Sequence, residues 1–181
     1  MNLTKRERRV KALAECSSYV ENVLTHALVA ELSSVLWQQD PSTPLQVFNA
    51  EVDNLGFDLV LTVGSQSRYV QLKQAHDEKI PARCSIRLSF ASLPGSCVVL
   101  MSHSLMSLQL RKFYFLGGGP SEPMPSIEDA RISRAPGRRS ASGEKKLRNN
   151  YRDVPVREFA GPLSITQLFD IMFPGHQPHG A

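Results

Sequence analysis

The 181-residue sequence has only three cysteines and no run of about 18 apolar residues, the length that a membrane-spanning helix needs. Cys16, Cys84 and Cys97 are too few and too scattered for a zinc motif or a disulfide framework, so we expect them to pack in the interior. The charged N-terminus, MNLTKRERRVKALAE, is unlike a signal peptide. We therefore expect a cytoplasmic protein that does not enter a membrane. Its length predicts a single domain over residues 1–181.

Positive charge is unevenly distributed along the chain. The net charge is +4, yet the segment from Arg131 to Arg157 carries nine Lys or Arg residues against two acids, Glu144 and Asp153. Residues 117–160 show no periodic pattern, which predicts a long basic loop or arm within the domain. Such an arm binds a polyanion or is simply solvated, and composition leaves both interpretations open. The candidates for nucleic-acid contacts are Arg138, Arg139, Lys145, Lys146 and Arg148.

The first forty residues have the pattern of helices. Thr4-x-x-Glu7 and Ser18-x-x-Glu21 both fit a capping box, so we expect one long helix or two helices broken near residues 16–18. An apolar stripe at spacings of three and four includes one acid, Glu31; its members are Val20, Leu24, Leu28, Glu31 and Val35. A carboxylate on such a stripe belongs to a structural ion pair or to a functional site, because burial of an isolated charge is costly.

The rest of the chain reads mainly as strands. We expect strands over Leu45–Asn49, Phe57–Val63, Arg68–Gln74, Cys97–Met101 and Leu108–Leu116, and a last helix that opens at Ser164. Residues 75–94 do not distinguish a strand from a crossover helix. This pattern of helices and strands predicts an α/β protein.

The two strands on either side of residues 64–67 predict a β-hairpin. If Val63 faces Arg68, Asp58 lies opposite Lys73 with Cβ atoms roughly 5 Å apart, and Gln71 lies on the same face. The pair could be a cross-strand ion pair on a solvated face. However, apolar residues occur on both faces of the hairpin, which favours a covered strand pair whose charges line a cleft.

These residues resemble a known family. The segments GFDLVL (56–61) and YVQLK (69–73) are similar to the PD-(D/E)XK nuclease superfamily, and within it to the Mrr-like variants whose second motif is Gln-X-Lys. The resemblance covers residues 31–101. It implies a restriction endonuclease-like α/β core, with a central mixed β-sheet flanked by helices and the element order αβββαβ. Gln71 stands where the commoner motif has an acid, and Phe57 stands where it has proline.

The resemblance also implies a function and a set of site residues. It implies a metal-dependent endonuclease that cleaves the phosphodiester bonds of nucleic acid, with DNA as the expected substrate and Mg²⁺ or Mn²⁺ as the cofactor. The implied metal ligands are Asp58, Gln71, the carbonyl of Leu72 and an acid before Gly56, Glu51 in preference to Asp53. The implied catalytic residues are Asp58, Gln71, Lys73 and the helix acid Glu31. A homodimer is compatible with this interpretation.

Two other interpretations remain open at this stage. One is a non-catalytic nucleic-acid-binding protein on the same scaffold, because Gln71 leaves the site less negative than an acid would. The other is a structural or adaptor domain in which Asp58 and Lys73 merely pair. The geometry of the folded chain separates them, because a site requires Glu31, Asp58, Gln71 and Lys73 to line one cleft.

Overall fold

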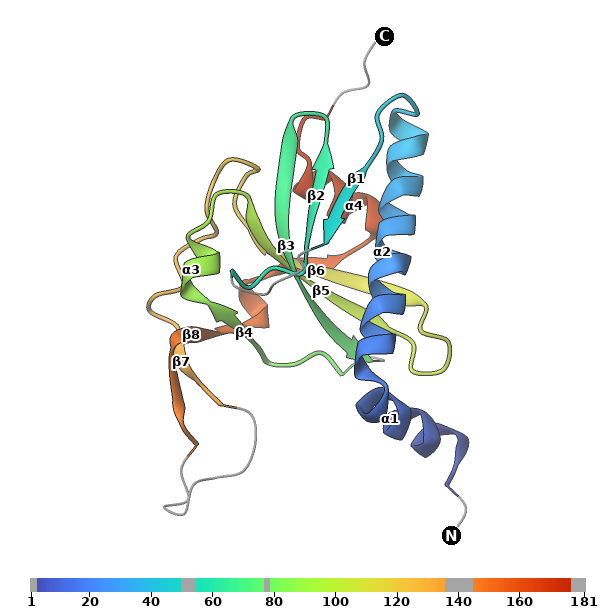
Figure 1. The fold of residues 1–181 in the computed structure, drawn as a ribbon, viewed down its shortest axis with the longest axis vertical. Helices are drawn as coiled ribbons and strands as arrows, with labels where there is room; N and C mark the ends of the chain where they lie inside the picture. Colours follow the sequence, from blue (N-terminus) through green and yellow to red (C-terminus); the bar gives the residue numbers. More distant parts are fainter. Residues whose placement is uncertain (1–2, 50–54, 77–78, 136–144, 177–181) are drawn as a thin grey trace.

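The structure is a computed structural model that describes residues 3–49, 55–76, 79–135 and 145–176. A six-stranded mixed sheet with the order β1-β2-β3-β5-β6-β9 forms its centre, and a three-stranded sheet with the order β4-β8-β7 lies beside it (Figure 1). Only β3 and β5 run parallel; the other pairs are antiparallel. The predicted α/β class with a central mixed sheet is confirmed. Within the described residues, no helix has both the length and the apolar character needed to cross a bilayer.

The chain forms these elements in the following order. The helical N-terminal part contains α1 (Lys5–Glu15) and α2 (Ser17–Gln39). The middle part contains β1 (Gln46–Asn49), β2 (Leu59–Val63), β3 (Gln66–His76), β4 (Arg83–Arg87), the short α3 (Leu88–Ala91), β5 (Ser96–His103) and β6 (Leu110–Gly117). The C-terminal part contains β7 (Arg131–Arg134), β8 (Leu147–Pro155), the 3₁₀ turn η1 (Val156–Glu158), β9 (Ala160–Leu163) and α4 (Ile165–Met172).

Of the two alternatives for the N-terminal part, two helices form, with the break at Cys16. Thr4 and Glu7 make the expected capping box, in which the Glu7 N–H donates to Thr4 Oγ1 and the Thr4 N–H donates to Glu7 Oε2. The second predicted box is wrong, because α2 begins at Ser17 after a Cys16 that has no side-chain cap bond. In α2 the buried stripe contains Leu32 in the place that was predicted for Glu31. The buried residues of this stripe are Val20, Leu24, Leu28, Leu32, Val35 and Leu36.

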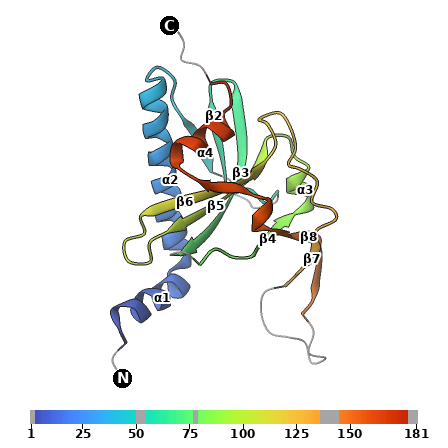
Figure 2. The ribbon, with the colours of Figure 1, turned by 180° about the vertical axis from the view of Figure 1, so that it is seen from behind.

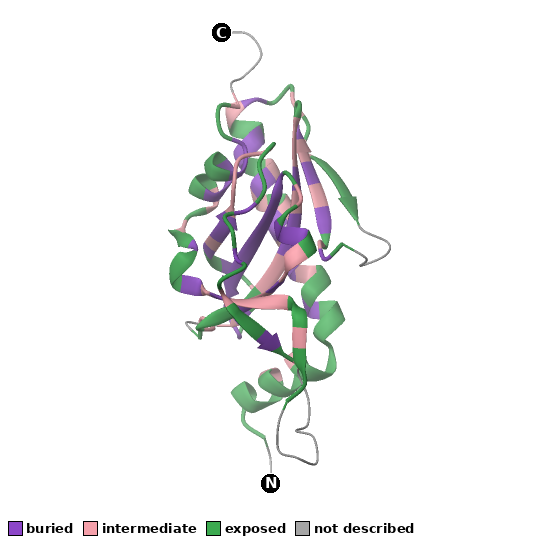
Figure 3. Cartoon of the chain, turned by 90° about the vertical axis from the view of Figure 1, so that its left-hand side faces the viewer, coloured by how far each residue is buried: buried purple, intermediate pink, exposed green. Residues whose placement is uncertain are grey.

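The central sheet is covered on both faces. On one face, the apolar side chains of α2 and α4 pack against those of β2, β3, β5 and β6. On the other face, residues of β4, α3 and β8 pack against β5 and β6 (Figure 2). All eight residues of β5 are buried, which marks it as the central strand (Figure 3). The predicted buried strand at Cys97–Met101 is confirmed and extended by this strand.

The hairpin forms, but with a register two residues away from the predicted one. Val63 pairs with Gln66 and Leu59 with Val70, so a two-residue turn, Gly64-Ser65, joins the strands. Gly64 takes φ 57°, a left-handed conformation that favours glycine and places it in the turn. A shift of two residues leaves every side chain on its original face, so the apolar pattern is satisfied by either register. Continued by one residue beyond the last pair, Leu59 and Val70, the observed register places Gln71, and not Lys73, opposite Asp58.

The segment 117–160, predicted as a long loop or arm, contains two strands. β7 and β8 form an antiparallel ribbon, and β8 also pairs with β4 from the segment that the sequence left undecided. Cys84, Ile86 and Val154 are buried where this sheet packs on the main one. The basic segment is therefore part of the folded body as far as Arg134 and from Lys145 onward.

Candidate cleft at the end of strand β2

A cleft of about 710 Å³ opens at the first residue of β2, where β3 continues without β2 and pairs only with β5. β3 is 11 residues long, whereas its partner β2 covers only its first half. The first turns of α2 lie beside the far end of β3 (Figure 1). Side chains from α2, β3, β4 and β5 line the cleft, together with the segment that leads into β2. Its polar lining includes Asp58, Lys73, Glu21, Asn22, Arg83 and Ser85.

Asp58 is attached to β3 by two hydrogen bonds. Its N–H donates to the carbonyl of Val70 at 2.9 Å, and its carboxylate oxygen Oδ2 accepts the N–H of Leu72 at 2.5 Å. The regular β2–β3 ladder begins at Leu59, one residue after Asp58. The carboxylate is thereby held at the mouth of the cleft by the backbone of the neighbouring strand.

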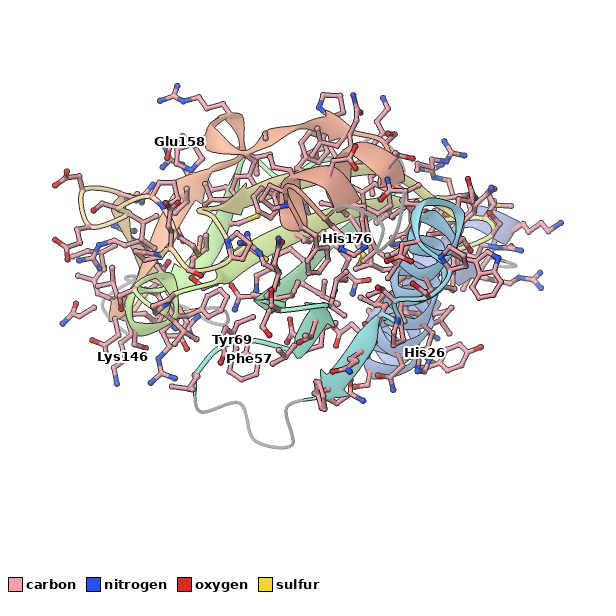
Figure 4. The ribbon with its side chains drawn as sticks, turned by 90° about the horizontal axis from the view of Figure 1, so that it is seen from above. His26, Phe57, Tyr69, Lys146, Glu158 and His176 are labelled. Carbon is pink, nitrogen blue, oxygen red and sulfur yellow. The ribbon has the colours of Figure 1, made fainter. Side chains whose placement is uncertain are left out.

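Gln71 is placed behind this carboxylate and does not line the cleft. The residue is 8% exposed, and its Nε2 donates to the carbonyl of Gly56 at 2.7 Å. Its Oε1 is buried and has no hydrogen-bond partner among the described residues. Phe57 packs edge to face on Tyr69, with ring centroids 5.2 Å apart (Figure 4). Gln71 and this aromatic pair therefore fix the segment 56–58 against β3.

Lys73 does line the cleft, next to the thiol of Cys84. Burial raises the pKa of the Cys84 thiol to about 11, and the nearby Lys73 ammonium opposes that rise. The thiol is therefore protonated at neutral pH, and Lys73 is the cation that this part of the cleft presents. Asp58 and Lys73, two of the four residues expected to meet, lie in one cleft.

The helix acid in the cleft is Glu21 and not Glu31. Glu21 lines the cleft and lies within 3.5 Å of Gln74 Nε2 on β3. Glu31 lies ten residues further on, about 15 Å along the axis of α2, and is not among the lining residues. Glu31 is half-buried, and this burial raises the pKa of its carboxyl group. The expectation that Glu31 lines the same cleft as Asp58 is wrong.

The sequence carried one signal for Glu21. Glu21 and Thr25 directly follow Val20 and Leu24, two members of the buried stripe, so they lie at its edge. Residues at the edge of a buried stripe face the boundary between the helix and the sheet. The apparent capping box at Ser18 and Glu21 gave this acid another explanation, which the structure removes.

The second sheet forms another wall of the cleft. Arg83 and Ser85 of β4 line it, and neither was a candidate from the sequence. Arg83 Nη1 donates to the carbonyl of Asp153 on β8 at 3.3 Å, which anchors the guanidinium at the cleft edge. The cleft thus has an acidic side chain, Glu21, on the wall formed by α2 and a basic side chain, Arg83, on the wall formed by β4.

Some predicted residues are outside this cleft or outside the described residues. Glu51, Asp53, Arg138 and Arg139 lie outside the described residues. Lys145 and Lys146 are exposed, and Lys146 lies at the periphery of the molecule in Figure 4. Arg148 is partly exposed and stacks on Tyr151, with its Cζ 3.4 Å from the ring centroid.

Comparison with other proteins adds no functional class. No protein-family model, curated protein or solved structure matches the chain. In the part of the chain that the structure describes, no group of three or more His, Cys, Asp or Glu side chains is placed to hold a metal ion. A functional assignment therefore depends on the residues of the cleft themselves.

Proposed function

We propose that the protein is a metal-dependent nuclease that hydrolyses phosphodiester bonds of nucleic acid, with DNA as the first substrate to test. The observation that carries the proposal is the meeting of Asp58, Lys73 and Glu21 in one cleft beside a basic sheet. Two carboxylates and an ammonium group are the residue types that such hydrolysis uses. The adaptor interpretation requires no cleft around Asp58 and Lys73.

The chain order around the cleft supports a restriction endonuclease-like core as part of this proposal. A helix, α2, precedes three antiparallel strands, β1 to β3, and β5 then returns parallel to β3. Asp58 lies one residue before β2, and Gln71 and Lys73 lie in β3 beyond its last pair with β2. The three-stranded sheet is an addition to the implied order αβββαβ.

The cleft has the hard oxygen ligands that Mg²⁺ or Mn²⁺ prefers. Asp58 and Glu21 are its two acids among the described residues, and Leu72 also lines it. The N–H and C=O of one strand residue point to the same side, so the Leu72 carbonyl points toward the side on which Asp58 lies. One or two carboxylates suffice for Mg²⁺ when phosphate oxygens and waters complete the octahedron. When bound, the ion would supply Lewis acidity and lower the pKa of a water.

The protein residues would prepare the substrate as follows. The hydrogen bond from Leu72 fixes the orientation of the Asp58 carboxylate before any substrate arrives. Lys73 presents an ammonium group with three donors, which can hold a phosphate oxygen or orient the attacking water. Arg83, at the opposite edge, can bind a neighbouring phosphate through its planar fork of donors.

A second candidate function is nucleic-acid binding without cleavage. One observation favours it: Gln71, the expected ligand, uses its Nε2 to hold Gly56 and does not line the cleft. A site without that ligand has lower metal affinity, because fewer oxygens bind the ion.

Cleavage assays separate the two functions. Purified protein is incubated with plasmid and with single-stranded substrates in Mg²⁺, Mn²⁺ or EDTA. The nuclease proposal predicts cutting that EDTA stops and that Asp58→Ala and Lys73→Ala abolish. Asp129→Ala and Lys112→Ala, exposed and away from the cleft, serve as matched controls that keep full activity. Binding without cutting under every metal condition would favour the second candidate.

A further inference from the structure

The three-stranded sheet has one apolar face and one polar face. Cys84, Ile86 and Val154 are buried against the main sheet. Because side chains alternate along a strand, the opposite face carries Arg83, Ser85 and Arg87 from β4. The strand register places Pro155, Asp153 and Tyr151 of β8 beside these three residues.

A hydrogen-bonded seam fixes the polar face. Ser85 Oγ lies 2.8 Å from Ser133 Oγ, and Ser133 Oγ donates to Asp153 Oδ1 at 2.5 Å. Asp153 is the only acid in the described parts of β7 and β8. Ser133 donates to the carboxylate of Asp153, and Arg83 donates to its backbone carbonyl. Asp153 therefore stabilises the three-stranded sheet from within.

Four basic side chains lie on β7 and on the segment that leads into β8. In the described ranges, the side chains of Arg131, Arg134, Lys145 and Lys146 make no hydrogen bond or ion pair, and all four are exposed. Figures 1 and 2 show that β7 and β8 extend as a ribbon away from the six-stranded sheet. This concentration of positive charge complements a polyanion.

Tyr151 lies on this polar face, and Arg148 reaches its ring across the register shift of the β7–β8 ladder, so the two add a flat stacking surface to this charge. The guanidinium lies over the ring at 3.4 Å from Cζ to the centroid, and both residues are partly exposed. Tyr151 is opposite Arg87 on β4. Planar Arg and aromatic side chains are the groups on which unpaired bases stack in proteins that bind single strands. A base inside a duplex is already stacked and does not offer its face.

We infer that this polar face binds single-stranded nucleic acid, with one base stacked on the Arg148–Tyr151 pair and phosphates along the arginines of β4. Arg83 lines the cleft, and Arg87 lies four residues along the same strand, about 13 Å away. A strand held at Tyr151 is thereby led to the cleft. The binding surface stands on its own geometry, and only its use in delivering a substrate rests on the proposed nuclease function.

The experiment measures binding by fluorescence anisotropy in EDTA, so that no cleavage is involved. The probes are a labelled single-stranded oligonucleotide as DNA and as RNA, the same backbone with abasic sites, and a duplex. Arg148→Lys keeps the charge but removes the planar group, and Tyr151→Ala removes the ring. Tyr151→Phe keeps the ring, and Tyr19→Ala, at an exposed tyrosine of α2, is the matched control.

We expect Arg148→Lys and Tyr151→Ala each to weaken single-strand binding about 5- to 150-fold, as the loss of one stacked base does. Binding to the abasic backbone should be unchanged, and Tyr151→Phe and Tyr19→Ala should bind like wild type. Equal losses on the abasic probe, no loss on the single strand, or tighter binding to the duplex would each overturn the inference. Failure of cleavage with stacking intact would overturn only the nuclease proposal.

Discussion

The carboxylate of Asp58 accepts a hydrogen bond from the backbone N–H of Leu72, with 2.5 Å between Oδ2 and N. The contact joins the entry of one strand to the middle of the next and makes the position of Asp58 independent of the regular ladder. It also allows the structural and chemical roles of this residue to be separated by mutation.

Asp58→Asn keeps an oxygen that can accept the Leu72 N–H but removes the negative charge. We expect this variant to have nearly wild-type stability and no metal-dependent cleavage. Asp58→Ala removes both the charge and the acceptor oxygen. Its free energy of unfolding should also be lower by about 1 kcal/mol, because a hydrogen bond is lost. Urea denaturation and plasmid cleavage are measured on the same preparations. Full activity in the Asn variant would exclude the carboxylate as a metal ligand.

The two acids of α2 offer a matched pair of substitutions. Glu21→Gln should lower cleavage strongly, because it removes a carboxylate from the cleft, and should raise the Mg²⁺ concentration needed for half-maximal rate. Glu31→Gln should leave both quantities unchanged. A titration of initial rate against Mg²⁺ checks this. The reverse result, with Glu31 essential and Glu21 dispensable, would contradict the placement of the site.

Glu31 should instead affect stability in a pH-dependent manner. Burial raises the pKa of its carboxyl group above the ordinary 4.5. A raised folded-state pKa means that stability is fully present below the unfolded value and is lost as the pH rises through the folded value. Glu31→Gln should therefore be more stable than wild type at pH 7, and the difference should shrink toward pH 4. The urea midpoints of both proteins at the two pH values test this prediction. A stability gain of the Gln variant that grows on acidification would contradict it.

The buried guanidinium of Arg68 should be replaceable by an apolar side chain. Arg68 is fully buried, its Nη2 donates to the Gly118 carbonyl at 2.9 Å, and its Cζ lies 5.4 Å from the Phe115 ring centroid. Nε and Nη1 have no partner in the described part of the chain. Arg68→Met removes unsatisfied donors and a buried charge while filling the space, so stability should be unchanged or higher.

Arg68→Ala should cost about 2–5 kcal/mol, because it leaves a cavity. Thermal denaturation of both variants decides the matter. A methionine variant clearly less stable than the wild type would show that the charge itself stabilises the core.

The basic segment should determine the salt dependence of binding. Each Lys or Arg that contacts a phosphate adds about −0.9 to the log-log salt slope on duplex DNA. Neutralising Arg138, Arg139, Lys145 and Lys146 together should flatten the slope by up to about 3 to 4 units if all four make contact, and equally for all sequences. Anisotropy titrations at several salt concentrations measure the slope. Identical slopes would mean that these residues only solubilise the segment.

The helices and strands that can be predicted from the sequence are those with a clear local periodic pattern. The stripe of α2, the alternation in β2 and β3, the apolar run of β5 and the cap at Ser164 each place an element and a buried face correctly. The hairpin register was missed by two residues, because both registers bury the same side chains. In the observed register Gly64, with φ 57°, lies in the two-residue turn.

The second sheet could not be predicted by the same means. β8 mixes exposed and buried residues without alternation, and its partner β4 lies about sixty residues earlier in the chain. Pairing over such a separation leaves no local signal in either strand. The wall of the cleft that contains Arg83 and Ser85 could therefore be found only from the folded structure. The same holds for Glu21, which lines the cleft where Glu31 was expected.

The cleft owes its existence to a difference in strand length. β2 has five residues and β3 has eleven, so the opening lies where the pairing of β3 with β2 stops while its pairing with β5 goes on. An opening of this origin persists when the side chains around it are exchanged. Acids and bases can therefore be gained or lost there one at a time, with little effect on the sheet, so that a few substitutions suffice to convert a cutting protein into a purely binding one or the reverse.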